Sequence, residues 1–167
     1  TWAEDPAPFM YLQRTDDDIQ DFADQKLQPS IDLCPAIHDE ESLRKSTSKK
    51  KSTAKKKMKS FPGGYIAMGS ANSASTLRSK SLARIAADEI DAYKRNVNEE
   101  GDPLLIISRR VANFPNSKQY RISTPTLKET SRIEPLFEAG DQRRYYVPCP
   151  HCNASADKTG EYFVIKW

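Results

Sequence analysis

The sequence predicts an α/β fold in which a parallel β-sheet is flanked by helices, and two observations support this prediction. Short apolar runs with the length of strands alternate along the chain with stretches whose apolar residues recur at helical spacing. Such alternation is typical of parallel sheets, because parallel strands are joined by crossover helices. In addition, one apolar run, residues 82–91, ends in three acids, as expected where a strand reaches a ligand site. The 167 residues are enough for one ordinary domain, or for one domain and a small module.

The first predicted element is a strand at residues 9–12, which is followed by a helix. Three consecutive aspartates, Asp16–Asp18, open the helix, where the helix dipole favours negative charge, and Thr15 or Asp16 can cap it. Apolar residues continue at helical spacing through Ile19, Phe22, Ala23 and Leu27. Pro29 is expected near the end of this helix, although Ile31 and Leu33 continue the apolar pattern and the break comes at Cys34–Pro35.

The middle of the chain continues the alternation of strands and helices. The predicted elements are a strand at 65–69, a short helix at 75–79, a strand at 82–91, a helix that opens at Asp102–Pro103, a strand at 119–123 and a short helix at 132–139. Proline is tolerated at the start of a helix because its missing N–H is not needed there. Together with the first strand and helix, these elements form a predicted partial domain at residues 1–140.

Residues 141–167 are predicted to form a separate β-rich segment. Cys149 and Cys152 are separated by two residues, a spacing that supplies half of a tetrahedral zinc site. His151 lies between them, and its side chain is expected to point away from the metal. A redox pair is less favoured, because no helical pattern follows the second cysteine. Two reduced thiols without the remaining zinc ligands are the alternative.

The net charge of +3 conceals an uneven distribution. Nine of the 26 basic residues lie at positions 44–59, where there is no acid, and the rest of the chain carries a net charge of −6. This stretch belongs to a predicted insert at residues 39–60, which has no apolar period and is expected to be a mobile loop or a solvated surface hairpin. Its lysines can contact DNA phosphates without reading bases, although a solvated loop explains the same composition. The candidate lysines are Lys49, Lys50, Lys51, Lys55, Lys56 and Lys57.

Asp88 and Glu89 are the strongest candidates for catalysis. In an open α/β sheet, ligands bind beyond the carboxyl ends of the strands. At such a position Asp88 can hold Mg²⁺, directly or through water, and Glu89 can orient and deprotonate a water that attacks a γ-phosphate. The pair therefore suits a Walker B aspartate and a catalytic glutamate in a sheet of the P-loop NTPase type. The alternative is a solvated strand-to-loop junction that is acidic by chance.

Two further motifs lie on either side of this strand in the sequence. Ser123, Thr124 and Pro125 follow the next predicted strand, where a hydroxyl pair can sense a phosphate and transmit its loss to neighbouring loops; an ordinary turn has the same composition. Arg78 precedes the acidic strand and can stabilise phosphoryl charge in its own subunit or in a neighbouring one. A solvated surface arginine is the default alternative for Arg78.

Six stretches of the sequence are specific in their combined order and spacing. They are Gly69–Ser79, Ala87–Tyr93, Glu100–Pro103, Ser123–Thr126, Ser131–Glu134 and Asp141–Cys152. In this combination the sequence resembles the large terminase subunit of tailed phages of the lambda-like type, closely over residues 61–152 and loosely over residues 1–38.

The resemblance implies part of an ATPase that drives double-stranded DNA into a capsid, with ATP and Mg²⁺ as ligands and Zn²⁺ as a further candidate in the full-length protein. By match of motif, Asp88 is the Walker B acid and Glu89 the base that activates water. Ser123–Pro125 is the coupling motif, and Arg78 is a candidate phosphate sensor or trans-acting finger. The implied partners are DNA, a small terminase subunit, the portal or procapsid and further copies of the chain, in the host cytoplasm. No membrane partner is expected, because no apolar run approaches the ~20 residues of a membrane span.

The sequence also departs from this family. It contains no G-x-x-x-x-G-K-[ST] motif, so the Walker A strand and loop are expected before Thr1, and the acids of the family's nuclease domain after Trp167. We therefore expect the chain to be a fragment that does not hydrolyse ATP by itself. Two other functions stay open from the residues alone: a DNA translocase or helicase of the same ATPase class, and a non-catalytic DNA-binding or assembly module that uses the basic insert and the cysteine pair.

Overall fold

The computed structural model describes residues 5–33, 57–61 and 63–142. The chain divides into two compact units, Thr1–Ile133 and Glu134–Trp167, and the sheet belongs to the first. Several predictions fall outside the described residues: the half zinc site, the strand at 161–167 and most of the basic insert. The site residues concerned are Lys49, Lys50, Lys51, Lys55, Lys56, Cys149 and Cys152.

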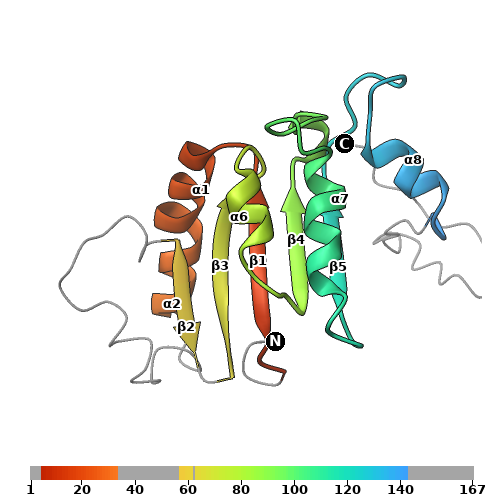
Figure 1. Ribbon diagram of the computed structural model, residues 1–167. Coiled ribbons are helices and arrows are strands. Elements are labelled where there is room, and N and C mark those ends of the chain that lie inside the picture. The colour runs from red at the N-terminus through yellow and green to blue at the C-terminus, as the bar shows by residue number, and fades with distance from the viewer. Residues whose placement is uncertain (1–4, 34–56, 62, 143–167) are drawn as a thin grey trace, which may run out of the picture. The chain divides into compact units, whose positions relative to one another are not determined.

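The first unit is built on a five-stranded sheet with the order β2-β3-β1-β4-β5 (Figure 1). The strands are β1 (Pro8–Gln13), β2 (Met58–Phe61), β3 (Gly64–Ser70), β4 (Arg84–Asp88) and β5 (Lys118–Ile122). β1, β3, β4 and β5 are parallel, as the sequence predicted, whereas β2 is antiparallel to β3. The sheet is therefore mixed, and the α/β class is confirmed.

The edge strand β2 includes the last residues of the predicted insert at 39–60, for which a mobile loop or a solvated surface hairpin was expected. Residues 58–60 pair with β3, and so does Phe61, with Met58 opposite Ala67 and Phe61 opposite Gly64. Gly63 has φ = 81° in the connection between the two strands, a conformation that glycine adopts without steric cost. The last residues of the insert thus form the first strand of a short hairpin.

The helices cover both faces of the sheet. α1 (Asp16–Phe22), the π-helical turn η1 (Ala23–Leu27) and α2 (Gln28–Leu33) form a continuous helical segment against one face. The helices α6 (Ala74–Arg78) and α7 (Pro103–Ser108), the latter extended by the 3₁₀ turn η3 (Arg109–Val111), cover the other face (Figure 1). The helix α8 (Ile133–Glu138) begins at Ile133, the last residue of the first unit, and its other residues belong to the second unit.

The predicted helix starts are confirmed by their caps. The hydroxyl of Thr15 accepts a hydrogen bond from the Asp18 N–H, and the Asp18 carboxylate accepts one from the Thr15 N–H, which completes a capping box. Asp102 caps α7 through its own side chain, which accepts the Leu104 N–H, with Pro103 in the first turn. Pro29 does not end its helix, which continues to Leu33 after a π-helical turn in which the Gln28 N–H donates to the Ala23 carbonyl.

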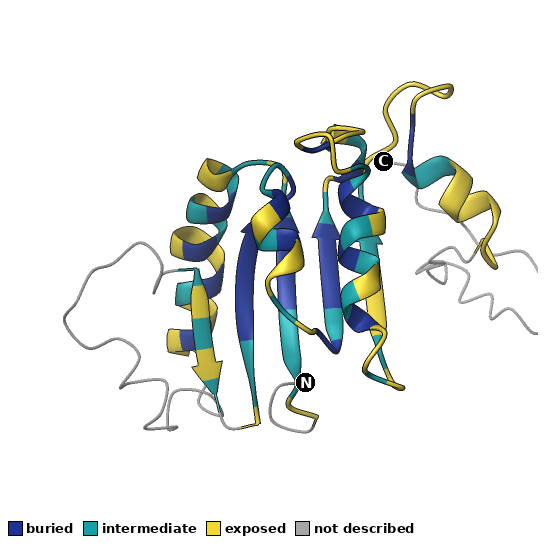
Figure 2. Cartoon of the chain, in the orientation of Figure 1, coloured by how far each residue is buried: buried dark blue, intermediate teal, exposed yellow. Residues whose placement is uncertain are grey.

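The central strands are buried and the edge strands are exposed, as Figure 2 shows. Side chains alternate between the faces along β1: Met10 and Leu12 pack toward α6 and α7, whereas Tyr11 packs toward α1. The same alternation in β4 sends Ile85 and Ala87 to the α7 face. Among the described residues, no helix is long and apolar enough to span a membrane.

Candidate functional site

The carboxyl end of β4 carries Asp88, and two side chains of the neighbouring strand β1 bind it. The Tyr11 hydroxyl donates to Asp88 Oδ2 over 2.7 Å, and Gln13 Nε2 donates to the same oxygen over 3.0 Å. Gln13 Nε2 also donates to the Tyr11 hydroxyl over 2.8 Å, so the three side chains form a closed triangle. The parallel register explains the geometry, because Leu12 lies opposite Ala87 and the next residues of both strands face each other.

The Tyr11 ring is held in place from the other side by α1. It is 8% exposed and stacks on Phe22, with the ring centroids 4.0 Å apart and an angle of 22° between the planes. Burial, followed by the hydrogen bond to Asp88, raises the pKa of Tyr11 far above its usual value. Tyr11 therefore stays protonated and acts as a fixed donor to Asp88.

Glu89 follows the strand in a left-handed backbone conformation. Its φ of 57° and ψ of 45° lie in a region that costs a residue with a Cβ roughly 1–2 kcal/mol. The Glu89 N–H donates to Asp88 Oδ1 over 3.1 Å, which helps to hold this turn. The sequence placed Glu89 and Asp91 on the strand; the structure corrects this, because β4 ends at Asp88 and the chain turns at Glu89.

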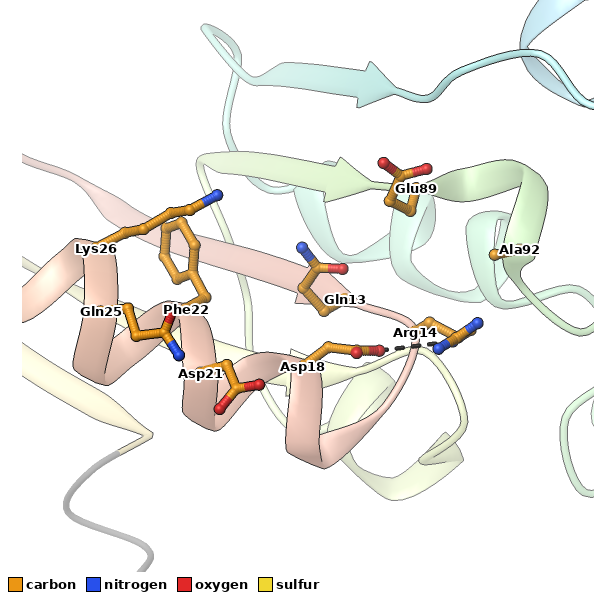
Figure 3. A pocket seen from close by; sticks show the side chains of 9 residues that line it. All are labelled: Gln13, Arg14, Asp18, Asp21, Phe22, Gln25, Lys26, Glu89 and Ala92. Carbon is orange, nitrogen blue, oxygen red and sulfur yellow. Dashed lines mark ion pairs between the residues drawn. The ribbon is translucent and has the colours of Figure 1, made fainter.

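The exposed Glu89 side chain lines a cavity of about 420 Å³ between α1 and the ends of β1 and β4 (Figure 3). Gln13 forms part of the same wall, so the cavity reaches the Asp88 triangle. The opposite wall is helix α1 together with Arg14 before it and the π-helical turn after it, with both acidic and basic side chains. These charged residues are Arg14, Asp18, Asp21 and Lys26, of which Arg14 and Asp18 form an ion pair over 3.5 Å.

The donor set at this strand end fits Mg²⁺ when phosphate and water supply the other ligands. Within the described residues, no group of three or more His, Cys, Asp or Glu side chains gathers to hold a metal. Mg²⁺ commonly binds through only one or two carboxylates in addition to phosphates and waters. Asp88 Oδ1 accepts the Glu89 N–H and, as a carboxylate oxygen, keeps a second lone pair for such a ligand.

The predicted coupling motif lies at the end of the adjacent strand. β5 pairs with β4 in parallel, with Ile122 opposite Asp88, and Ser123 is the next residue. The Ser123 hydroxyl accepts a hydrogen bond from the Asp91 N–H over 3.1 Å. The structure therefore brings the acidic turn and the Ser123–Pro125 segment together, although Thr124 and Pro125 are exposed.

The structure places Arg78 and Lys57 in ion pairs. Arg78, at the end of α6, pairs with Glu100 and does not line the cavity that Glu89 lines. Lys57, just before β2, pairs with Asp16 of α1 over 2.6 Å. Their predicted roles, in sensing phosphate and in binding DNA, stay predictions.

Sequence reasoning did not assign the residues that hold the site together. The sequence predicts only that Tyr11 lies in a strand and that Gln13 follows it. It predicts Asp91 only as one of three acids at the end of a strand. The alternation of faces along β1 places Tyr11 and Gln13 on one side, but the strand that lies beside them is not evident from sequence. Arg132, which is 8% exposed and pairs with Asp102 over 2.6 Å, was also missed.

The fold and the site define an α/β protein with an acidic site at the carboxyl ends of its strands. The chain belongs to the family described as phage terminase large subunit gpA, ATPase domain, whose model matches residues 1–167. The resemblance to lambda-like large terminase subunits is thereby confirmed.

Individual relatives agree with this family. The chain is 30% identical over 146 residues to the terminase large subunit of Enterobacteria phage P21, and 29% identical over 161 residues to that of Escherichia phage lambda. These matches cover 86% and 92% of this chain but only 22% and 24% of the two relatives, so the chain spans about a quarter of their length. Among solved structures, the large terminase of a thermophilic bacteriophage matches with a TM-score of 0.44 and 12% identity, over 71% of this chain and 26% of that one.

Proposed function

We propose that this chain is part of the ATP-hydrolysing domain of a motor that packages double-stranded DNA into a viral capsid. The observation that carries the proposal is the strand end itself: Asp88 is bound by Tyr11 and Gln13, and Glu89 lines a cavity beside it. Membership of the terminase large subunit family favours this function over a helicase or a non-catalytic DNA-binding module.

The two acids have separate roles in this proposal. Asp88 would hold Mg²⁺, which neutralises phosphate charge when it is bound. Glu89 accepts a proton from the water that attacks the γ-phosphate, and it follows β4 on a left-handed turn at the rim of the cavity that it lines. Tyr11 and Gln13 fix the rotamer of Asp88, because two donors converge on one of its oxygens.

The phosphate-binding loop is proposed to come from residues outside this chain, since the sequence contains no G-x-x-x-x-G-K-[ST] motif. The sheet offers a place for the strand that would carry it. β5 is the last strand in the described sheet, and its Tyr120 and Ile122 are 50% and 51% exposed. A further strand on β5 would cover these side chains and bring a loop to the carboxyl edge near Asp88.

The remaining roles follow from the family resemblance and are proposals as well. We propose a partial ATPase domain at residues 1–140, a segment at 141–167 with half a zinc site at Cys149 and Cys152, and DNA contact by the lysines of the insert. The proposed partners are a small terminase subunit, the portal or procapsid and further copies of the chain, in the host cytoplasm.

The test uses the full-length protein with procapsids and double-stranded DNA. We expect Mg²⁺-dependent release of phosphate from ATP and DNA that is protected from nuclease, and we expect Glu89→Gln to abolish both. Glu99→Gln is the matched control, because Glu99 is also exposed and also has a positive φ, 61°, but lies in the loop before α7. Turnover that survives Glu89→Gln would refute the assigned role, and the 167-residue chain alone should release phosphate only at background rate.

A further inference from the structure

A second acid on the same turn, Asp91, contacts a different part of the molecule. It lies in the 3₁₀ turn η2 (Ile90–Ala92), two residues after Glu89, and it does not line the cavity. Its side-chain hydrogen bonds, and the one that its N–H donates to Ser123, all reach the segment that follows β5, 32 to 42 residues further along the chain. Asp91 therefore connects the end of β4 to a segment that is distant in sequence.

The bonds of Asp91 hold that segment at its two ends. At the start, the Asp91 N–H donates to Ser123 Oγ over 3.1 Å, and Oδ2 accepts the Thr126 N–H over 3.0 Å. At the far end, Oδ1 accepts the N–H groups of Arg132 and Ile133 over 2.7 and 2.9 Å. One carboxylate thus spans the loop between the coupling motif and the first residue of α8.

The protonation of Asp91 agrees with this geometry. Burial alone would raise its pKa, but hydrogen bonds from the Ser131 side chain and from the N–H groups of Ile133, Arg132 and Thr126 outweigh burial and lower the pKa to about 2. The carboxylate is therefore ionised at neutral pH, and its hydrogen bonds to these donors are charge-assisted.

The far end of the segment is in turn fixed to the body of the unit. The buried Arg132 guanidinium donates to the Asp102 carboxylate over 2.6 Å and to the Lys94 carbonyl over 3.0 Å. Asp102 caps α7, whose side chains pack in the core. Because Arg132 and Asp102 hold the far end of the loop to α7, that end cannot simply follow Asp91. A shift of Asp91 would consequently change the conformation of the loop between residues 123 and 133.

The turn between Glu89 and Asp91 is short and rigid. The single residue between the two acids, Ile90, is fully buried at 0% exposure and packs in the core cluster beside α7. The N–H groups of Ala92 and Tyr93 donate back to the carbonyls of Glu89 and Ile90 over 3.0 and 3.2 Å. The backbone between the two acids therefore has little freedom to absorb a change at Glu89 before it reaches Asp91.

We propose that Asp91 is a positioning residue that couples the catalytic turn at Glu89 to the segment from Ser123 to Ile133. This inference rests on the proposed ATPase function. When the γ-phosphate leaves the cavity, the turn that carries Glu89 relaxes, and Asp91 transmits the change to the Ser123 hydroxyl and to the start of α8. A purely structural contact would hold the loop in the same way whether or not nucleotide is bound.

Two measurements on the full-length protein test the coupling. In Asp91→Asn we expect ATP turnover within about threefold of wild type but at least about a tenfold loss of DNA packaged per ATP, the usual range of an allosteric coupling. By hydrogen exchange, Mg²⁺-ATP should change the protection of residues 123–133 in wild type, and this change should be lost in Asp91→Asn. Asp91→Glu, which keeps the charge but not the spacing, should give the same pattern if the asparagine variant does not fold.

Two controls separate coupling from other effects. Ile107→Val removes one methylene from a buried side chain of α7 and lowers stability, but it should not alter the DNA packaged per ATP. Asp16→Asn removes one carboxylate on the outside of α1 and should be neutral as well. The coupling role is refuted if turnover and packaging fall in parallel in the Asp91 variants, or if packaging and exchange stay as in wild type. Absence of ATP turnover in wild type would instead refute the proposed function.

Discussion

Glu89 and Asp91 lie two residues apart on one turn, yet their surroundings are opposite. Glu89 is exposed, has a left-handed backbone and lines a cavity. Asp91 accepts four hydrogen bonds from Thr126, Arg132 and Ile133, and its pKa lies near 2. The comparison shows that neighbouring acids at one strand end need not belong to the same site. The distribution of donors decides which carboxylate is available to a ligand and which one holds the protein together.

Replacing Glu89 by glycine should have the largest effect, because ATP turnover should be lost while the stability of the fold is kept. Glycine adopts φ near 57° without a steric cost, so relief of roughly 1–2 kcal/mol equals or exceeds the entropic cost of glycine, which is roughly 0.5–1 kcal/mol. The free energy of unfolding should therefore stay constant or rise by up to about 1 kcal/mol. ATP turnover should fall by about 100-fold or more, because the general base is lost. Phosphate release and urea unfolding of the same preparation measure the two effects.

The matched control for this variant is Glu99→Gly. Glu99 has φ = 61° and is exposed, so it should gain similar stability, but its turnover should equal that of wild type. A clear loss of stability in Glu89→Gly would show that the Glu89 side chain holds the fold, and the contrast with Asp91 would disappear.

Removing the Tyr11 hydroxyl should have the next largest effect. Tyr11→Phe keeps the ring stacked on Phe22 and removes only the donor to Asp88, so we expect about a tenfold fall in kcat at saturating Mg²⁺ and a higher Mg²⁺ requirement. Steady-state kinetics over a range of Mg²⁺ concentrations measure both. Tyr65→Phe is the control, because that hydroxyl bonds only weakly to the Ser81 carbonyl over 3.3 Å. An unchanged Mg²⁺ requirement in Tyr11→Phe would contradict a role for this residue in orienting Asp88.

The stabilisation by Asp91 should depend on pH in the acid range. The pKa of its carboxyl is lowered from 3.8 to about 2 by folding, so its stabilising effect is complete above 3.8 and is lost as the pH falls toward 2. The difference in unfolding free energy between wild type and Asp91→Asn should be constant above about pH 5 and shrink by about 1 kcal/mol between about pH 4 and pH 2, after allowance for solvent screening. Urea titrations across this range measure it, and a difference that does not change with pH would contradict the lowered pKa.

Much of the fold follows from local sequence. The helix start at Thr15 and the opening of α7 at Asp102–Pro103 were predicted, because capping side chains act on their own backbone neighbours. The edge strand at 58–61 was expected only as part of one alternative, a surface hairpin, because its sequence Met-Lys-Ser-Phe does not alternate between apolar and polar residues and follows a lysine-rich stretch. Its pairing depends on the nearby strand β3, which offers a free edge.

The site was predictable only in part. Asp88 and Glu89 were found from their place after an apolar run, but the turn at Glu89 was not, since glutamate gives no signal for a positive φ. Tyr11 and Gln13 bind Asp88 through strand pairing, and the residues that this register brings together lie 75 to 77 positions apart in sequence. Asp91 could not be separated from its neighbours for the same reason: its partners come from a loop more than 30 residues away.

The ion pair between Lys57 and Asp16 is expected to have the smallest effect on stability. It therefore sets a lower limit against which the stabilisation by Asp91 can be compared. Its atoms are 2.6 Å apart, closer than those in the bonds of Asp91 to Thr126, Arg132 and Ile133, but the two side chains are 32% and 63% exposed. A double-mutant cycle with Lys57→Ala and Asp16→Ala should therefore give a coupling energy below about 1 kcal/mol that decreases with added salt. Asp91 should exceed this value, because its partners are several fixed N–H groups rather than one flexible ammonium group. The coupling energy between Lys57 and Asp16 could instead prove as large as the free energy of unfolding lost in Asp91→Asn. That result would mean that a short distance sets the strength of these contacts, and that the number of donors and their fixed positions do not.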